Sequence, residues 1–321
     1  MVNRKTLSMG LRFIVSFGLL AALVWIMRKD IGSIWLILKN SNKAFFIIGV
    51  AINMPLTVLL AFRLKLLLAG QKINIGMNDV ISLTLIGFFF NNFLPTAIGG
   101  DIAKAYYTSK RTNNKLASYA AILSDRLFGS IANIFIASIG LIFIGRTLNN
   151  KAILYGISFI FLVSVVATFL LFNKKAETQV FSGKGILDKV KEKLYKLYSA
   201  INTYRDHPFL LIKIVLLSIF MQVCGIVSIY CFVLSIGGVM PLLKLFLIIP
   251  LVWAVSMLPS INGLGVREGA FVYFLKNDLG ADKAFAISLL WLSIIIIYSI
   301  AGGITHLLYP VKGKIEDNPE V

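Results

Sequence analysis

Long apolar runs separated by short polar stretches dominate the hydrophobic pattern of this chain. A helix needs about 20 mainly apolar residues to cross the hydrocarbon core of a membrane. Six runs meet this length, and we predict a spanning helix for each of them: 11–27, 44–62, 116–144, 152–172, 209–236 and 284–309. The pattern therefore predicts an all-α polytopic membrane protein.

Two further apolar runs are too short to span. Residues 80–93 and 245–258 hold 14 residues each, which as helices would extend only about 21 Å. Each run stops at a Leu-Pro pair, whose prolines are Pro95 and Pro259. Proline removes an amide donor and disfavours helix in the residue before it. We therefore predict that each run is the first arm of a re-entrant broken-helix hairpin, with the prolines as hinges.

These broken runs occupy corresponding places in two halves of the sequence. Each half reads span, span, hairpin, span, with the hairpins at 80–107 and 245–275 and their prolines 164 positions apart. Three crossings per half would invert the second half, so that the two hairpins enter from opposite sides and meet near the midplane. We therefore predict two membrane repeats, 1–151 and 152–321.

Composition indicates the class of protein, and the distribution of charge indicates its orientation in the membrane. The chain is 58% hydrophobic and 14% charged, whereas a soluble domain carries about 25% charged residues. The net charge of +18 fits basic loops held on the cytoplasmic side better than a nucleic-acid partner. With the N-terminus inside, the inside loops together with Lys213 hold 21 Lys and Arg, and the outside loops hold 9. We expect a multi-pass protein of the plasma (inner) membrane with both termini cytoplasmic.

Two polar stretches predict helices at the membrane surface. Within 184–205, apolar residues recur at helical spacing with lysines between them, which indicates a basic amphipathic helix on anionic lipid of the inner leaflet. A plain linker helix fits this stretch equally well. Residues 31–38 predict a smaller interfacial helix on the outer face. The sequence has no nucleotide-binding loop and no metal-ligand cluster, so we expect no cofactor and no metal.

Charged residues within membrane segments are the candidates for function. Arginine offers a planar fork suited to phosphate, glycines let backbone approach a ligand closely, and short helices starting at Ile102 and Val266 would present N–H groups to an anion. We therefore predict a central site for a phosphate headgroup, built around Arg267, Arg126 and the two glycine turns. The candidate binding residues are Arg267, Glu268, Arg126, Asp125, Asp101, Lys104, Asn92, Gly99, Gly100, Gly263, Gly265 and Asn262.

Several of these candidates also have a structural interpretation. Asp125 and Arg126 could lie at the cytoplasmic end of their helix, and Lys104 could snorkel to the interface. Arg267 and Glu268 could form a salt bridge with each other or across the hairpins. The asparagines near the breaks could satisfy the backbone of the broken helices whatever the substrate.

Three motifs carry a family resemblance: NFLP with GGD within 92–101, DRLFG at 125–129, and GLGVREG at 263–269. At these residues the chain resembles the lysylphosphatidylglycerol synthase transmembrane (flippase-like) family, and the likeness covers about 10–310. Lys104 departs from the family, which often has arginine there. In full-length synthases this module precedes a soluble domain that transfers an aminoacyl group from tRNA to phosphatidylglycerol, and the module is held to flip the product.

The resemblance favours lipid translocation over aminoacyl transfer. The chain ends twelve residues after Tyr309, so we expect no transferase domain. The leading hypothesis is a flippase or transporter, not an enzyme, that moves an anionic or polyprenyl-phosphate-type lipid headgroup. One alternative is a membrane enzyme of lipid modification, of the phosphatidylglycerol lysyltransferase type, with Glu268 or Asp101 as base. The other is a partner subunit that anchors a separate transferase through 173–208.

Overall fold

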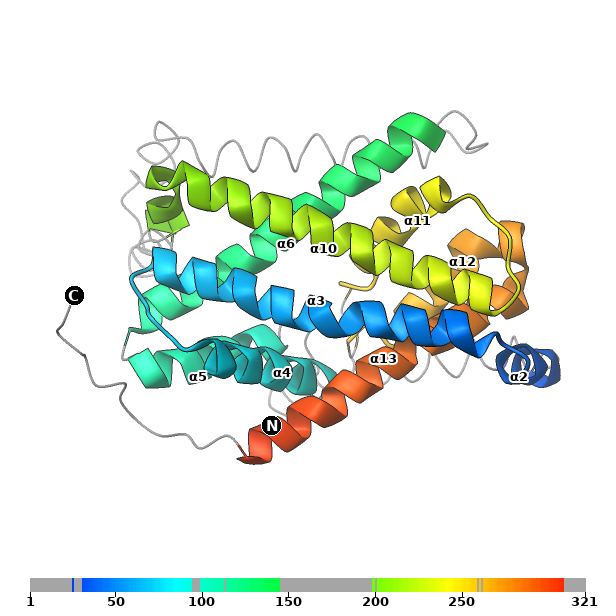
Figure 1. Cartoon of the computed structure of the whole chain (residues 1–321), viewed down its shortest axis with the longest axis horizontal. Coiled ribbons are helices and arrows are strands. Elements are labelled where there is room, and N and C mark those ends of the chain that lie inside the picture. The colour runs from blue at the N-terminus through cyan, green and yellow to red at the C-terminus, as the bar shows by residue number, and fades with distance from the viewer. Residues whose placement is uncertain are drawn as a thin grey trace, which may run out of the picture.

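The computed structural model describes residues 25, 31–93, 99–112, 114–144, 198–199, 201–258, 260 and 262–308. These residues form a bundle of helices (Figure 1). The elements are α2 (Ile31–Lys39), α3 (Lys43–Gly70), α4 (Met77–Phe93), α5 (Gly99–Thr112), α6 (Lys115–Ile144), the 3-10 turn η2 (Thr203–Asp206), α10 (Pro208–Ser235), α11 (Leu242–Val255), α12 (Val266–Leu279) and α13 (Ala281–Leu308). The predicted span 152–172, the two hinge prolines, the predicted repeat boundary and most of 11–27 and 184–205 lie outside the described residues.

Four helices are long and apolar enough to cross a membrane, namely α3, α6, α10 and α13. They match four of the predicted spans. The helix α3 continues to Gly70 rather than ending at 62 as predicted. It continues because Leu64, Leu67 and Leu68 are buried in the protein and the charge of Arg63 is paired.

The helices α3 and α10 lie side by side and run antiparallel (Figure 1). At one end, the N–H of Asn42 before α3 donates to the carbonyl of Ser235 at the end of α10, at 2.6 Å. At the other end, the hydroxyl of Tyr204 in η2 donates to the carbonyl of Leu67 at 2.8 Å. Burial raises the pKa of the Tyr204 phenol, which keeps it a neutral donor. This described end of the predicted amphipathic helix therefore packs on protein.

Two pairs of shorter helices fold back on themselves. At the mouth of the α4/α5 pair, Asp79 near the start of α4 forms an ion pair with Arg111 near the end of α5. At the mouth of the α11/α12 pair, Lys244 near the start of α11 lies 2.5 Å from Asp278 near the end of α12. The α4/α5 hairpin follows α3 and the α11/α12 hairpin follows α10. Because α3 and α10 are antiparallel, the hairpins enter the bundle from opposite ends (Figure 1).

Corresponding helices of the two halves pack on corresponding partners. The first arm α4 packs on α13 and the first arm α11 packs on α6, while α5 packs on α6 and α12 on α13. Glycines allow the closest approaches. A Cβ on Gly302 of α13 would lie 2.0 Å from the carbonyl oxygen of Leu85, and one on Gly140 of α6 would lie 2.5 Å from the backbone nitrogen of Leu247. Each first arm is thus held against a spanning helix of the other half.

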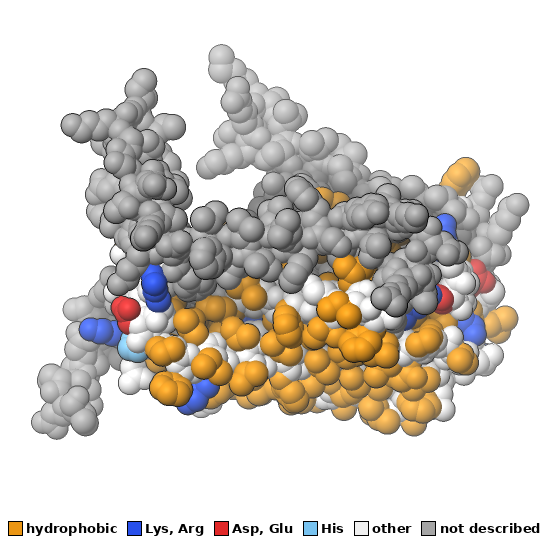
Figure 2. Space-filling view, turned by 90° about the horizontal axis from the view of Figure 1, so that it is seen from above, with side chains coloured by type: hydrophobic (Ala, Val, Ile, Leu, Met, Phe, Trp, Pro, Cys, Tyr) orange, Lys and Arg blue, Asp and Glu red, His pale blue; other side chains and the backbone are white. Residues whose placement is uncertain are grey.

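Two buried apolar clusters lie at opposite ends of α10. One includes Ile214 with residues of α3, α4 and α6, and the other includes Ile226 to Ile236 with residues of α11, α12 and α13. Between these two ends, Ser218, Met221, Gln222 and Gly225 of α10 line a cavity. The outward surfaces of the bundle carry exposed hydrophobic side chains (Figure 2), as a surface in contact with lipid requires.

The helix predicted at 31–38 is present as α2. Ile34 is buried against α13, and the hydroxyl of Ser33 donates to Asp282 at the start of α13, at 2.7 Å. Trp35 on the same helix is 66% exposed. An amphipathic aromatic ring of this kind suits the boundary between headgroups and acyl chains.

Candidate functional site

A cavity of about 500 Å³ lies between the two apolar clusters. Its walls come from the four long helices and from the inner ends of both hairpins. Along α3 the lining runs from Arg63 to Asn53, and along α6 it runs from Asp125 to Asn133. The charged side chains Arg63 and Asp125 therefore lie toward the start of α10. The rest of the wall combines uncharged polar side chains, such as Asn133 and Gln222, with apolar and aromatic ones, including Trp253 and Trp291. The cavity therefore joins a charged region to an apolar one.

One ion pair in the charged region is buried and fixed. The Nε of Arg63 lies 2.7 Å from Oδ1 of Asp125, and NH1 of Arg63 donates to the hydroxyl of Ser218 at 2.9 Å. Arg63 is 5% exposed and Asp125 7% exposed. The pair connects α3, α6 and α10, so Asp125 lies inside the bundle and not at the end of its helix.

Sequence reasoning missed Arg63, because this residue directly follows the predicted span 44–62 and so falls in the loop after it. A buried carboxylate needs a cation close by, and Asp125 sits in an otherwise apolar helix. A carboxylate at position 125 was therefore the available signal for a cation nearby. It did not name the partner, since Arg63 is 62 positions away in the sequence.

A second cluster centres on Asp101, the third residue of α5. Its Oδ1 lies 2.9 Å from Nζ of Lys104, and its Oδ2 lies 2.6 Å from NH1 of Arg126. The side chain of Arg126 is 30% exposed and lines the cavity. That of Lys104 is 13% exposed and is not among the described residues that line the cavity. Lys104 is therefore held in a largely buried ion pair.

The first break is capped by an asparagine from the arm before it. The side-chain oxygen of Asn91 accepts the N–H of Gly100 at 2.8 Å, which satisfies one of the donors that the first turn of a helix leaves unpaired. The helix α5 includes Gly99 and Gly100, so its start at Ile102 was wrongly predicted. A Cβ on Gly100 would lie 2.0 Å from the carbonyl oxygen of Gly87, and only glycine permits this approach of α5 to α4.

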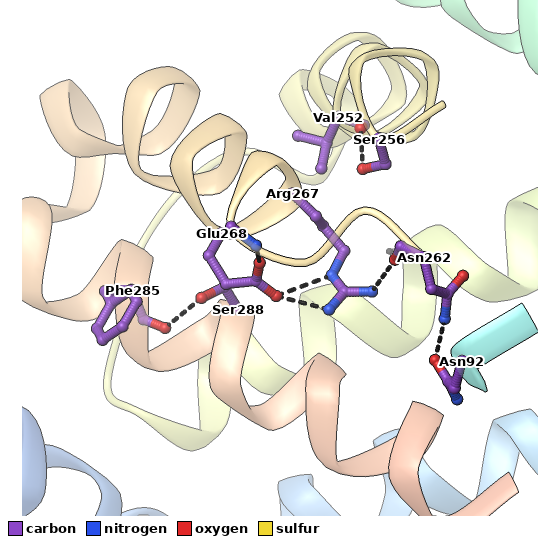
Figure 3. A network of polar contacts seen from close by, with 9 residues as sticks. Asn92, Val252, Ser256, Asn262, Arg267, Glu268, Phe285 and Ser288 are labelled. Carbon is purple, nitrogen blue, oxygen red and sulfur yellow. Dashed lines mark hydrogen bonds and ion pairs between the residues drawn. The ribbon is translucent and has the colours of Figure 1, made fainter. Parts of the chain in front are cut away.

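The second break contains a buried ion pair formed by neighbouring residues (Figure 3). The guanidinium of Arg267 bonds Oε1 of Glu268, with NH2 at 2.6 Å and Nε at 3.1 Å. The other carboxylate oxygen accepts the N–H of Gly265 at 2.6 Å. Arg267 is 3% exposed and Glu268 0% exposed. The mutual salt bridge considered from the sequence is therefore the arrangement observed.

The second break has the conformation that its glycines allow. Gly263 and Gly265 have φ values of +77° and +79°, a region that glycine enters without steric cost. The helix α12 then starts at Val266, as predicted. The NH1 of Arg267 donates to the carbonyl of Asn262 at 3.4 Å, so Arg267 ties the turn to the first residues of α12.

A hydrogen bond joins the two breaks. The side-chain nitrogen of Asn262 in the second break donates to the side-chain oxygen of Asn92 at the end of α4 (Figure 3). Both asparagines line the cavity. This contact brings together two points that are 170 positions apart in the sequence.

The structure brings five of the predicted site residues to the cavity wall: Asn92, Asp101, Asp125, Arg126 and Asn262. The others support these five. Gly99 and Gly100 start α5, Lys104 holds Asp101, and Gly263, Gly265, Arg267 and Glu268 build the second break. Arg267 and Glu268 are not among the described residues that line the cavity. Within the described ranges, no group of three His, Cys, Asp or Glu could hold a metal ion.

A bundle of apolar spanning helices around a charged cavity defines a polytopic membrane protein with an internal polar site. The chain belongs to the family of the lysylphosphatidylglycerol synthase TM region, whose profile matches residues 11–302. The family resemblance seen in the motifs is thereby confirmed.

Three relatives of this chain are named UPF0104 membrane proteins. One from Pyrococcus horikoshii is 25% identical over 302 residues, which cover 84% of this chain and 89% of the relative. One from Methanothermobacter thermautotrophicus is 21% identical, over 81% of this chain and 83% of the relative. One from Methanocaldococcus jannaschii is 22% identical, over 90% and 91%. No solved structure matches the chain.

Proposed function

We propose that this protein is a lipid flippase or transporter that moves the headgroup of an anionic or polyprenyl-phosphate-type lipid across the bilayer. The observation that carries the proposal is the cavity, which joins a charged wall to an apolar one inside a membrane protein. Ionisable side chains at such depth are costly and mark substrate pathways. The charged wall suits a headgroup, and the apolar wall suits the first part of its tail.

Arg126 is the side chain we assign to the headgroup. It lines the cavity, and its side chain is 30% exposed, against 6% for Arg63 and 4% for Arg267. A guanidinium presents several donors in one plane and binds phosphate oxygens in pairs. Asn92 and Asn262 line the same cavity and offer hydrogen bonds to other parts of a headgroup.

The two hairpins provide a way to alternate access. We propose that α4/α5 and α11/α12 are re-entrant hairpins of an inverted repeat, because they enter from opposite ends and each first arm packs on the other half. One half would rock against the other about the antiparallel pair α3 and α10. The hydrogen bond between Asn92 and Asn262 would break when the hairpins part. We also propose the plasma membrane as location, with the end at which α10 begins facing the cytoplasm.

An enzymatic role for Glu268 finds no support in this geometry. Its carboxylate is 0% exposed and bonds both Arg267 and Gly265. A general base must reach the proton that it abstracts. Asp101 does face the cavity, but both of its oxygens bond cations.

The proposal is tested by comparing lipid movement in proteoliposomes that contain wild-type protein with movement in those that contain Arg126→Met. Phosphatidylglycerol with a fluorescent acyl chain is followed by its accessibility to a membrane-impermeant quencher. We expect wild-type protein to move it, and Arg126→Met to slow movement by about tenfold or more, because a charge-assisted hydrogen bond contributes about 1.5–3 kcal/mol.

The matched control is Arg111→Met, since Arg111 lies at the mouth of the first hairpin and does not line the cavity. It should retain the wild-type rate, and the thermal stability of both variants should be measured in detergent. Wild-type protein that moves lipid no faster than empty liposomes would overturn the proposed function. An unchanged rate for Arg126→Met would overturn the role of Arg126.

A further inference from the structure

Three amide side chains line the cavity, one from each of three long helices: Asn53 of α3, Asn133 of α6 and Gln222 of α10. In all three the side-chain nitrogen donates to a backbone carbonyl. Because a carbonyl can only accept, these bonds determine which end of each amide is the oxygen. Within the described part of the chain, none of the three oxygens accepts a hydrogen bond. The cavity thus presents neutral acceptors that a ligand with donors would satisfy.

The orientation of two of these amides is fixed most firmly by burial. Asn53 is 5% exposed, and its nitrogen donates both to the carbonyl of Gly49 and to the hydroxyl of Ser228, each at 2.7 Å. Asn133 is 7% exposed, and its unpaired oxygen is itself buried. A buried acceptor without a partner is costly and calls for an explanation.

The acceptors extend away from the side chain that we assign to the phosphate. Gln222 donates to the carbonyl of Gly129 at 3.3 Å, and Asn133 donates to the carbonyl of Pro250 in α11 at 3.2 Å. Along α6, Gly129 and Asn133 follow Arg126 by rises of about 4.5 and 10.5 Å. The part of a headgroup that lies beyond its phosphate would therefore meet these amides.

Aromatic rings lie beside the same amides. Trp253 follows Pro250 by one turn of α11, and Gly225 follows Gln222 by one turn of α10. A Cβ on Gly225 would lie 3.1 Å from Cη2 of Trp253, and the ring centroids of Trp253 and Trp291 are 6.4 Å apart. Both rings line the cavity. An indole offers a broad apolar face, which suits the carbon face of a polyol while its hydroxyls point to the amides.

Hydroxyl donors suit this wall better than an ammonium does. Asp101 and Asp125 are the two carboxylates among the described residues that line the cavity, and both already bond cations. A buried ammonium needs a paired anion. It would also be repelled by the guanidinium of Arg63, whose nitrogens lie 3.6 Å from the place of a Cβ on Gly129. A neutral donor meets neither obstacle.

We infer that the cavity recognises a headgroup that carries hydroxyl groups beyond its phosphate, either a polyol such as glycerol or a sugar. The hydroxyls donate to the amide oxygens of Gln222, Asn133 and Asn53, and the tryptophan rings cover the carbon face. A site built to bind a hydroxyl discriminates strongly against an analogue that lacks it, because the acceptors are then left unpaired. The inference rests on the proposed function and narrows its substrate class.

Binding of two matched phosphodiester lipids tests the inference. Phosphatidylglycerol carries hydroxyls on its headgroup, and phosphatidylpropanol has the same charge and the same carbon chain without them. Each is offered with identical acyl chains in phosphatidylcholine nanodiscs, and bound lipid is counted by native mass spectrometry. We expect wild-type protein to prefer phosphatidylglycerol by about tenfold, because the analogue cannot donate to the amide oxygens.

Replacing the amides should remove this preference without removing binding. Gln222→Met keeps the length of the side chain and should lower the preference to about threefold, and adding Asn133→Leu should abolish it. Both variants should bind phosphatidylpropanol as wild-type protein does. Cys224→Ala is the matched control, since Cys224 lies on α10 close to Gln222 and is not among the described residues that line the cavity. It should keep the wild-type preference.

The outcomes separate the inference from the proposed function. If wild-type protein moves no anionic lipid, the proposed function fails. If it binds and moves phosphatidylglycerol and phosphatidylpropanol equally well, the inference fails and the function stands. A preference for phosphatidylethanolamine, whose headgroup offers an ammonium, over phosphatidylglycerol would also overturn the inference. Should the double variant not fold, as judged by size-exclusion chromatography, the preference of Gln222→Met decides the question alone.

Discussion

Asp101 and Glu268 are each the third residue of the helix that follows a break, yet they serve different partners. Glu268 reaches back to the N–H of Gly265 and pairs with its own neighbour Arg267. Asp101 is shorter by one carbon and bonds Lys104 and Arg126. A negative side chain is favourable in the first turn of either helix, because the helix dipole is positive there.

The difference follows from how each break satisfies its backbone. In the second hairpin Glu268 accepts the N–H of Gly265, so the break is closed by its own residues. In the first hairpin Asn91 accepts the N–H of Gly100 instead. Both oxygens of Asp101 therefore remain available to side chains, namely those of Lys104 and Arg126. The same broken-hairpin shape supports a closed structural turn in one half and an open charged wall in the other.

The largest effect is expected from breaking the closed turn. Glu268→Ala leaves Arg267 without its carboxylate and the N–H of Gly265 without its acceptor, both in a buried site. Removing one partner of a buried pair costs about 3–5 kcal/mol. We expect a loss of this size in the free energy of unfolding, measured by denaturant titration in mixed micelles.

A second variant separates the effect of the lost charge from the effect of the lost acceptor for the N–H of Gly265. Arg267→Met with Glu268→Gln removes both charges and leaves an amide oxygen that can accept from Gly265. It should recover more than half of the loss. A double variant as unstable as Glu268→Ala would contradict the structural role assigned to this pair.

Steric contacts between first arms and spanning helices should have the next largest effect. Gly302→Ala places a Cβ 2.0 Å from the carbonyl oxygen of Leu85, and Gly140→Ala places one 2.5 Å from the backbone nitrogen of Leu247. Both contacts are with backbone, so a helix must move, and overpacking costs about 1–3 kcal/mol. We expect both variants to lower thermal stability, Gly302→Ala more strongly.

Gly269→Ala is the matched control for these two variants. Gly269 lies in α12, and a Cβ there would have no heavy atom within 4 Å. Alanine is favoured over glycine in a helix by about 0.5–1 kcal/mol, so this variant should be slightly stabilised. If Gly269→Ala destabilised the protein as much as Gly302→Ala, close helix approach could not be the cause.

Much of the fold could be predicted from the sequence because its causes are local. The length of an apolar run determines whether a helix spans, and four of the predicted spans are helices that could cross a membrane. The glycines of GLGVREG determine a turn with positive φ before Val266. The bounds were less accurate, as α3 shows, because its last turns are held by leucines that pack on other elements.

The candidate site could be predicted only in part because its pairing is not local. The sequence identified Asp101, Asp125 and Arg126 as charges within apolar surroundings. It could not identify Arg63 as the partner of Asp125, since the two meet only when α3 packs on α6. Nor could it show that Arg267 faces its own neighbour, because arginine side chains can point in several directions from one backbone position.

Smaller effects are expected where the two breaks touch. Asn92→Ala removes the oxygen that accepts from Asn262, and a hydrogen bond of this kind contributes about 0.5–1.5 kcal/mol. Asn262 has a φ of +47°, so Asn262→Gly removes the side chain without straining the backbone. In a double-mutant cycle the two changes should couple by about 0.5 kcal/mol or more in stability. Additive effects would show that the contact does not stabilise this conformation.

The smallest effects are expected at the mouths of the hairpins, where the two halves are alike. The pairs Asp79–Arg111 and Lys244–Asp278 occupy corresponding positions, and the side chains of the latter pair are 28% and 22% exposed. Ion pairs with access to water contribute about 0–1 kcal/mol, less at high salt. Asp79→Asn and Asp278→Asn should each lower the free energy of unfolding by less than about 1 kcal/mol, and 1 M salt should abolish the difference from wild type. A much larger, salt-independent loss for one variant would show that the hairpins differ at their mouths as well as at their breaks.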